Sequence, residues 1–440
     1  MTPEADTANG GPGLLGSRRF LPLFLTQALG ALNDNLFKNA LVVLVLFQAP
    51  AGPILVALAG GIFIAPFVLF SSIAGQLADR HDKAAVIRAT KLCELGLMAV
   101  GAAGFLSGSH VLLFAVLFGL GAQATFFGPL KYGILPDHLG PAELMRGNAL
   151  IEAATFAAIL AGTIAGGVLI TVPHGPAAVA VAGLLLALAG VAAGFRVPPA
   201  RPAAPELRMG WNVAGDTLGL LRRARDNRPV WLCILGLSWF WALGATFLAE
   251  FPVIAARNFA ADGHVVTLML AVFSIGVGAG SIVAGRLLRG EVSARHVPFA
   301  ALLLSVFAWD FARLCMGVSP ETGWHSVGQM LAAPAAWRVL ADLLLVAACG
   351  GAFSVPLYAV LQSRAEPSQR ARMIAANNVL NAIFMVAGAA AIAGLAALQI
   401  SAPAIILVFA CLNLGVAAHT GRLLPAGDAS TAAAEPEPAP

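Results

Sequence analysis

The sequence predicts an all-α integral membrane protein with twelve transmembrane helices in two six-helix pseudo-repeats. Hydrophobic residues make up 59% of the 440 residues and charged residues only 11%, far from the composition of soluble globular proteins. Apolar runs of about 20 residues, the length that crosses a bilayer, follow one another along the chain. The expected helices cover residues 20–47, 53–76, 84–107, 110–135, 143–171, 176–195, 230–256, 265–288, 297–318, 337–361, 371–398 and 402–422.

Lys and Arg residues gather at alternate connections between these helices. The connections near 48–53, 107–110 and 171–176 contain neither, and only Arg257 and Arg338 fall near that face. By the positive-inside rule, both termini and the long connection after the sixth helix are expected in the cytoplasm, which predicts a multi-pass membrane protein. The net charge of +4 is therefore a topology signal and does not indicate a nucleic-acid partner.

Composition divides the chain into five segments. The expected boundaries give a disordered cytoplasmic N-terminus (1–19), a first six-helix bundle (20–195), a basic cytoplasmic linker (196–229), a second six-helix bundle (230–422) and a disordered cytoplasmic tail (423–440). The Pro- and Ala-rich start of the linker predicts flexibility, and residues 211–228 predict a basic helix on the anionic inner leaflet.

Related sequences recur in the two halves. Residues 126–132 (FFGPLKY) end the fourth expected helix, and residues 353–358 (FSVPLY) lie near the end of the tenth. Each is followed by a related stretch, GNAL at 147–150 and NNVL at 377–380. These paired motifs predict parallel repeats around a site at the membrane midplane. Gly162, Gly166 and Gly167 predict close helix packing.

The turn after the second helix supports the same architecture. Residues 75–83 (GQLADRHDK) resemble the loop signature of the major facilitator superfamily, which implies a major facilitator fold. Asp79 can cap a helix end and take a charge-assisted bond from Arg80 or a neighbouring basic residue, so both are candidate gating residues. Such a latch would hold an inner gate closed. The second-half counterpart, residues 281–286 (SIVAGR), lacks the acid and predicts an asymmetric gate.

A polar cluster interrupts the first apolar stretch. Asn33, Asp34 and Asn35, followed by Lys38, stand at its centre, where charges are costly and usually line a pathway or a binding cavity. Asp34 and Lys38 are four residues apart on one helix face, so partial mutual neutralisation is expected. The cluster indicates either a buried ion pair that fixes helix packing or, as we favour, a polar site on a transport path.

Several long motifs resemble the lysophospholipid transporter family, closest to the transporter half of proteins fused to an acyltransferase and an acyl-carrier synthetase. The similarity covers about residues 20–420, and the motifs include residues 21–27, 33–39, 129–136, 147–152, 238–241, 337–342 and 355–358. The resemblance implies a flippase that moves lysophosphatidylethanolamine and related lysolipids from the outer to the inner leaflet for re-acylation. A separate acyltransferase or acyl-carrier synthetase is a possible partner, beside membrane lipids and the lysolipid itself.

A zwitterionic head group needs an acid for its ammonium and a base for its phosphate. Asp34 is the candidate for the ammonium, with Asn33 and Asn35 adding hydrogen bonds. Lys38 and Lys131 are candidates for the phosphate, although Lys131 also fits a cytoplasmic helix end under the positive-inside rule.

Other polar residues of the spans leave alternatives open. Tyr132 can add a hydroxyl to the site, and Glu152 is either a coupling or substrate site or a hydrogen-bond donor in packing. Lys91 and Glu94 are expected to pair on the third helix. Asp310 and Arg313, three residues apart, predict a self-neutralising structural pair.

Catalytic and metal sites are not expected. The five cysteines have no metal-like spacing, no His is followed four residues later by Asp, and no Gly-x-Ser-x-Gly motif occurs. We therefore expect a monomeric transporter without cofactors. The alternatives are a facilitator for a small solute or drug coupled to protons or cations, an intramembrane acyltransferase, and a silent membrane anchor for a separate acyltransferase.

Overall fold

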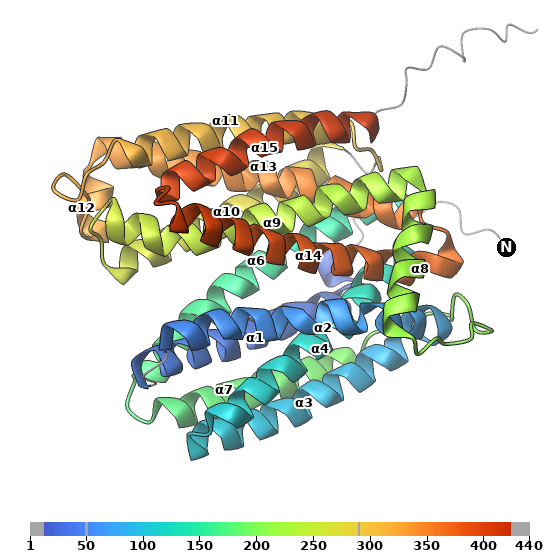
Figure 1. The fold of residues 1–440 in the computed structure, drawn as a ribbon. Coiled ribbons are helices and arrows are strands. Elements are labelled where there is room, and N and C mark those ends of the chain that lie inside the picture. Colours follow the sequence, from blue (N-terminus) through green and yellow to red (C-terminus); the bar gives the residue numbers. More distant parts are fainter. Residues whose placement is uncertain (1–12, 49–51, 289–290, 424–440) are drawn as a thin grey trace, which may run out of the picture.

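The computed structural model describes residues 13–48, 52–288 and 291–423, and these residues form helices and no strand (Figure 1). Twelve helices are long and apolar enough to cross a membrane, which confirms the predicted fold class. The α-helices are α1 Leu21–Gln48, α2 Gly52–Arg80, α3 Lys83–Ser107, α4 His110–Gly133, α5 Leu135–His138, α6 Pro141–Thr171, α7 Gly175–Gly194, α8 Val213–Asp226, α9 Arg228–Arg257, α10 Gly263–Leu287, α11 Val297–Met316, α12 Val327–Ala332, α13 Pro334–Arg364, α14 Arg370–Ala397 and α15 Ala402–Thr420. Short 3₁₀ helices lie at Leu14–Gly16, Pro367–Gln369 and Gly421–Leu423.

The helices form two halves with the same internal packing (Figure 1). In the first half α1 packs on α6, α2 on α4 and α3 on α7; in the second, α9 packs on α14, α10 on α13 and α11 on α15. Between the halves, α2 packs on α14 and α6 on α10. Each first-half pair has its counterpart six spans later, so the packing repeats as the paired sequence motifs predict.

Glycines bring the two central helices of the first half together. A methyl group on Gly162 would meet the carbonyl of Leu32, and one on Gly166 would meet that of Leu36, both in the backbone of α1. Backbone cannot move aside as a flexible side chain can. The predicted close packing at Gly162 and Gly166 is therefore confirmed, and it fixes α1 against α6.

Gly166→Ala is accordingly expected to destabilise the protein by about 1–3 kcal/mol, because the added methyl group overpacks the α1–α6 contact. Gly60→Ala is the matched control, since a methyl group there meets nothing within 4 Å. Thermal unfolding of the two purified variants, followed by size-exclusion chromatography in detergent, measures the difference. Equal midpoints would contradict the inferred contact.

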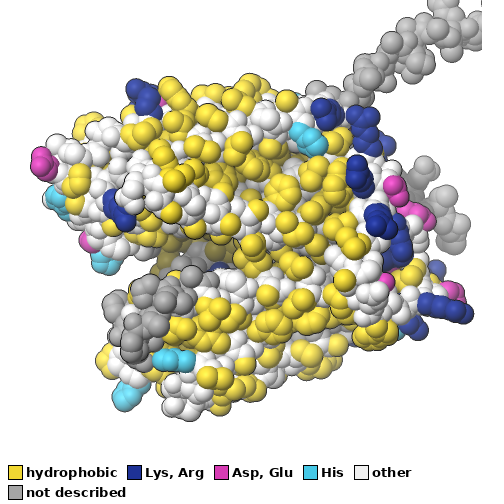
Figure 2. Space-filling view, viewed as in Figure 1, with side chains coloured by type: hydrophobic (Ala, Val, Ile, Leu, Met, Phe, Trp, Pro, Cys, Tyr) yellow, Lys and Arg dark blue, Asp and Glu magenta, His cyan; other side chains and the backbone are white. Residues whose placement is uncertain are grey.

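The two ends of the bundle differ in charge and in packing. Lys and Arg gather at the end where α8 lies, here called the basic end, and are sparse at the other, here called the opposite end (Figure 2). The space-filling view shows a hollow between the two halves that opens at the opposite end, with a Lys or Arg side chain inside it (Figure 2). At the basic end the halves are in contact. The structure is therefore open at one end of a central path and closed at the other.

The connection between the halves is packed against the first half. The backbone N–H of Ala204 donates to the carbonyl of Asp79 at 2.8 Å, and that of Ala200 donates to Asp82 Oδ1 at 2.9 Å. The start of the linker, which the sequence predicts to be flexible, is thus hydrogen-bonded to Asp79 in the last turn of α2 and to Asp82 in the loop after it. The predicted helix within 211–228 is present as α8, which packs through Leu220 and Ala224.

The N-terminal segment 1–19 is expected to be disordered, but residues 13–19 contact the first half. Leu14 is buried, and Arg19 forms an ion pair with Glu143 at 2.5 Å. These contacts order residues 13–19 against the first half. Residues 1–12 and 424–440, where disorder is also expected, lie outside the described residues.

Candidate substrate site

Asp34 lies near the middle of α1 and is 9% exposed. Its Oδ1 has no hydrogen-bond partner among the described residues. Lys38, one turn later, is half-buried, and its ammonium lies 5.4 Å from the centroid of the Phe63 ring on α2. The described side chains form no direct Asp34–Lys38 ion pair, because Lys38 lies over an aromatic face, and the two charges interact only at longer range, as the predicted partial neutralisation requires. A buried carboxylate without a partner is costly, which marks Asp34 as a functional candidate.

The neighbours of Asp34 point elsewhere. Asn33 is fully buried, and its amide donates to Glu94 Oε1 on α3 at 3.2 Å. Asn35 donates to the carbonyl of Ala31, within its own helix, at 2.7 Å. Successive helical residues point about 100° apart, so the three side chains face three directions. The structure therefore does not bring Asn33 and Asn35 to the side of Asp34.

A buried ion pair lies on α3 behind Asn33. Lys91 Nζ is 2.6 Å from Glu94 Oε2, both side chains are 1% exposed, and Gln123 donates to the same oxygen at 3.0 Å. This confirms the expected Lys91–Glu94 pair. Asp34 lies close enough to interact electrostatically with this pair. Because Glu94 already has three polar partners, Asp34 is the acid of this cluster that is left to take a ligand.

The second cation of the site comes from α4. Lys131 is half-buried, and its ammonium lies 4.7 Å from the centroid of the Tyr132 ring. It is within electrostatic range of both Asp34 and Glu152. A position near two buried carboxylates favours a binding role for Lys131 over a topological one.

Glu152 on α6 completes the set. Its side chain is 1% exposed, Oε2 accepts a hydrogen bond from the Tyr132 hydroxyl at 3.1 Å, and Oε1 has no partner among the described residues. Of the residues predicted for the substrate site, the structure thus groups five on three helices of the first half: Asp34, Lys38, Lys131, Tyr132 and Glu152.

The only two tyrosines of the chain form a contact between the two halves next to this group. The rings of Tyr132 on α4 and Tyr358 on α13 stack with centroids 4.2 Å apart and an interplanar angle of 10°. Trp241 of α9 donates its indole N–H to the Tyr358 hydroxyl at 2.9 Å. Tyr358 and Trp241 were not predicted as site residues, although both lie in the motifs that carry the family resemblance. The stack therefore forms an aromatic contact between the two halves.

Asp79 closes the basic end by binding the other half. Its carboxylate accepts from the backbone N–H groups of Ala371 and Arg372 at 3.0 and 3.2 Å, and from Arg372 Nε at 2.9 Å. Asp79 is fully buried, and Arg372 is 9% exposed. The carboxylate therefore caps the N-terminus of α14 and pairs with its guanidinium. The predicted helix cap and charge-assisted bond are therefore present, but Arg80 is not the partner: the guanidinium comes from Arg372 on the facing helix of the second half.

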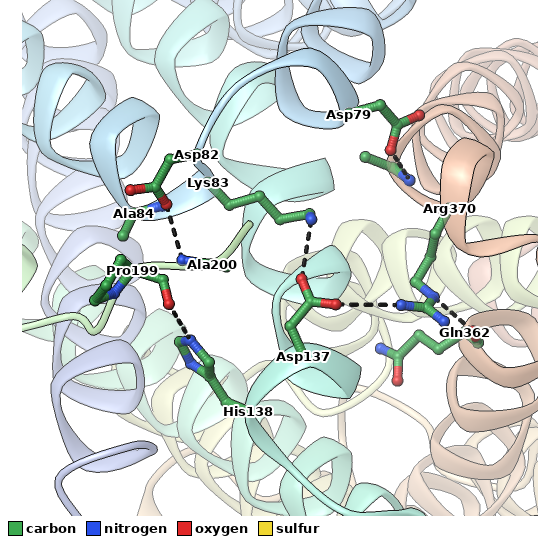
Figure 3. Close-up of polar contacts among 11 residues, drawn as sticks. Asp79, Asp82, Lys83, Ala84, Asp137, His138, Pro199, Ala200, Gln362 and Arg370 are labelled. Carbon is green, nitrogen blue, oxygen red and sulfur yellow. Dashed lines mark hydrogen bonds and ion pairs between the residues drawn. The ribbon is translucent and has the colours of Figure 1, made fainter. Parts of the chain in front are cut away.

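A second charged contact crosses beside the first (Figure 3). Asp137 of α5 lies 2.9 Å from Lys83 Nζ in its own half and 3.5 Å from Arg370 Nη1 in the other. Figure 3 shows Asp137 between these two cations. At the equivalent place on α6 and α10, a methyl group on Gly285 would lie 3.1 Å from the Ala149 side chain. One side of the closure is therefore charged, and the other is made of small residues.

An amide pair lies between these charges and the tyrosines. Asn148 of α6 and Gln362 of α13 exchange hydrogen bonds at 2.7 and 2.9 Å, and both are buried. Nothing in the sequence marks Gln362 as a partner of a residue 214 positions earlier. Three layers thus close the basic end: ion pairs, an amide pair and a tyrosine stack.

Comparison with known proteins places this geometry in a family. Residues 20–319 match the Major Facilitator Superfamily. Proteins described as lysophospholipid transporter LplT, from Shigella boydii serotype 4 and from Escherichia coli strain K12, are 31% identical to the chain over 363 residues, which is 80% of this chain and 82% of each relative. The chain belongs to the lysophospholipid transporter family of the major facilitator superfamily. The resemblance expected from the motifs is thereby confirmed.

Solved structures share the fold of this family member at low sequence identity. The human organic anion transporter MFSD10 (TETRAN) is similar with a TM-score of 0.75 at 18% identity, covering 93% of this chain and all of that one. A bacterial homologue of the iron transporter ferroportin in outward-facing state gives a TM-score of 0.67 at 14% identity, covering 92% of this chain and all of that one. These likenesses support the major facilitator fold.

Proposed function

We propose that this protein is a lysophospholipid transporter that moves lysophosphatidylethanolamine and related lysolipids from the outer to the inner leaflet of a bacterial inner membrane. The relatives at 31% identity are described as lysophospholipid transporters, and they align over most of the chain. The observation that carries the proposal is a buried carboxylate oxygen without a hydrogen-bond partner, on Asp34, in the same group as Lys38 and Lys131 inside a bundle of membrane helices.

This group complements a zwitterionic head group. The ammonium of an ethanolamine would bind Asp34, whose Oδ1 needs a donor. The phosphate would bind Lys38 and Lys131, whose ammonium groups lie 5.4 and 4.7 Å from the centroids of aromatic rings. Glu152, held by Tyr132, offers a second acceptor for the glycerol hydroxyl that a lysolipid exposes. A single acyl chain can then lie in the hollow or against neighbouring lipid.

Transport would proceed by alternating access. The hollow admits a lysolipid from the opposite end, while the three layers close the basic end (Figure 2). Release requires α2 to separate from α14 and α6 from α10, which breaks the Asp79–Arg372 pair. In this scheme Asp79 and Arg372 stabilise the state that loads the substrate.

The proposed orientation places the basic end in the cytoplasm, with both termini there. Glu206→Cys and Glu321→Cys, introduced singly into a cysteine-free background, test it because both positions are exposed. An impermeant maleimide added to intact spheroplasts should label position 321 and spare position 206. Labelling both positions from the same side would contradict the twelve-helix orientation.

Transport would supply a lysolipid to an enzyme on the cytoplasmic side. Re-acylation consumes the lysolipid there, so we propose a separate acyltransferase or acyl-carrier synthetase as a functional partner and the monomer as the transporting unit. The chain itself is a membrane transporter of the major facilitator type.

The cellular test follows radiolabelled lysophosphatidylethanolamine in spheroplasts that lack the endogenous transporter. Expression of this chain should increase transfer to the inner leaflet about tenfold or more over the empty vector, consistent with a catalysed rather than spontaneous flip. An Asp34→Asn, Lys131→Gln double variant should remain at the vector level. Equal transfer with and without the protein, at matched expression, would refute the proposal and favour a small-solute transporter.

A further inference from the structure

A charged cluster lies away from the central site, where α11 and α13 meet near the opposite end. Arg338 donates Nε and Nη2 to Asp310 Oδ2 at 3.1 and 2.7 Å, and Arg313 Nη2 lies 3.5 Å from Asp310 Oδ1. The predicted Asp310–Arg313 pair is thus present, but a second arginine shares the carboxylate. Asp310 therefore contacts two guanidinium groups at once.

The arginines of the cluster face outward and its acids inward. The side chains of Arg313 and Arg338 are 56% and 59% exposed, whereas Asp310 is 18% exposed. Each guanidinium carries five N–H donors, and Asp310 occupies two of those on Arg338. Most donors of both arginines thus remain available to an acceptor from outside the protein.

The cluster stands at the end of a lipid-facing surface. Exposed apolar side chains recur along α11 at helical spacing and lead to Arg313: Phe299, Leu302, Val306 and Trp309. Trp309 and Trp337 are 50% and 56% exposed, and Arg313 Cζ lies 5.8 Å from the Trp309 ring centroid. Exposed tryptophans beside arginines are typical of the level of the lipid head groups.

A buried acceptor lies behind the arginines. Asp342 of α13 is 6% exposed and lies within hydrogen-bond reach of the Asp310 carboxyl group, and no N–H or O–H group of the other described residues donates to its Oδ2. A buried polar atom without a partner requires a ligand or a strong reason to persist. Donors for a phosphate and an acceptor for an ammonium or hydroxyl therefore stand side by side, at the end of the molecule where positively charged residues are otherwise sparse.

We propose that Arg313, Arg338 and Asp342, flanked by Trp309 and Trp337, form a binding site for the head group of a zwitterionic glycerophospholipid in the leaflet at the opposite end. The guanidinium groups hold the phosphate, and Asp342 accepts from the ammonium. The site holds a lipid at the outer surface of the second half and is separate from the central transport site, so either assignment can fail without the other.

Native mass spectrometry of the purified full-length protein tests the site. Phosphatidylethanolamine is the probe, diacylglycerol with the same acyl chains is the phosphate-free control, and all variants carry Asp34→Asn to limit binding at the central site. The double variant with Arg313→Gln and Arg338→Gln should retain one bound phosphatidylethanolamine about tenfold less than the parent, because the charge-assisted bonds to the phosphate are lost. Its retention of diacylglycerol should be unchanged. Arg257→Gln, an exposed arginine at the same end, is the matched control and should bind as the parent does.

Two further variants keep the test decisive. Arg313→Gln alone leaves the Arg338–Asp310 bonds intact and should still weaken retention severalfold. Asp342→Asn should reduce the preference for phosphatidylethanolamine over phosphatidylglycerol, which lacks an ammonium. Unchanged retention in the arginine variants, or an equal loss of diacylglycerol, would overturn the proposal. The second result would mean that the surface binds acyl chains only.

Discussion

Asp34→Asn is expected to lower the apparent affinity for lysophosphatidylethanolamine about ten- to a hundredfold, since a charge-assisted hydrogen bond contributes roughly 1.5–3 kcal/mol. The substitution keeps the size of the side chain and removes its charge. Lysophosphatidylglycerol has no ammonium, so its transport should be affected less. Lys38→Ala should impair both lysolipids, because each carries the phosphate. Uptake of the two lysolipids, normalised to protein in the membrane, measures the difference.

The control for this experiment is Glu206→Gln, which removes an exposed acid from the connection between the halves. It should transport both lysolipids as the parent does. An equal loss for both head groups in Asp34→Asn would assign Asp34 to helix packing or ion coupling. Wild-type transport would remove Asp34 from the substrate site altogether.

Asp79→Asn is expected to shift the protein toward the state that is open at the basic end. The change removes the charge that neutralises Arg372 and weakens the cap on α14. Removing one partner of a buried pair is strongly unfavourable to the conformation that contains it, by about 3–5 kcal/mol. Ala375 is fully buried at this contact, against Gly75 of α2, and is the site for a cysteine probe, Ala375→Cys. In a cysteine-free background, its alkylation from the basic side should therefore become at least about tenfold faster in Asp79→Asn.

Arg80→Gln serves as the matched control for the gate. It removes the adjacent charge predicted from the loop signature, but Asp79 is bound by Ala371 and Arg372 instead. Alkylation of Ala375→Cys should therefore stay near the parent rate in Arg80→Gln. Equal rates in the parent and Asp79→Asn would rule out a latch at this position, and acceleration by Arg80→Gln alone would restore the pair predicted from the sequence.

The helix bounds could be predicted to within a few residues for these spans, because a membrane span is a continuous apolar run in the sequence. The expected span 84–107 is observed at Lys83–Ser107, and 176–195 at Gly175–Gly194. Burial of the backbone in lipid forces each apolar run into a helix whatever its partners. Close packing at Gly166 also follows from the sequence, because a small residue in a membrane helix indicates a close neighbour, although the sequence does not name α1 as that neighbour.

The candidate site was predicted only in part, for geometric reasons. A run of three polar residues is continuous in sequence, but its side chains lie about 100° apart on a helix. Asn33 therefore donates to Glu94, and Asn35 bonds within α1, while the Asp34 carboxylate keeps an unpartnered oxygen on a different face. Helical periodicity applied within the run would have separated them.

The partners across the two halves could not be derived from the chain. Asp79 meets Arg372, 293 residues later, and Asn148 meets Gln362, 214 residues later. The loop signature indicated that Asp79 acts as a latch without indicating its partner, because the sequence does not specify how the two bundles face each other. Such contacts depend on how the two bundles are arranged, and a local sequence motif does not identify a partner more than 200 residues away.

Reconstitution tests the central claim most directly. Purified protein is placed in liposomes that carry fluorescent lysophosphatidylethanolamine in both leaflets, and a membrane-impermeant reductant then destroys the label on the outer side. With no other protein present, an active transporter should bring the labelled lysolipid of the inner leaflet to the outer side within minutes. The fraction of fluorescence destroyed should then rise from about half toward nearly all. Liposomes with Asp34→Asn should stay near half. A plateau at half for the parent protein, at confirmed incorporation, would contradict lysophospholipid transport by this chain.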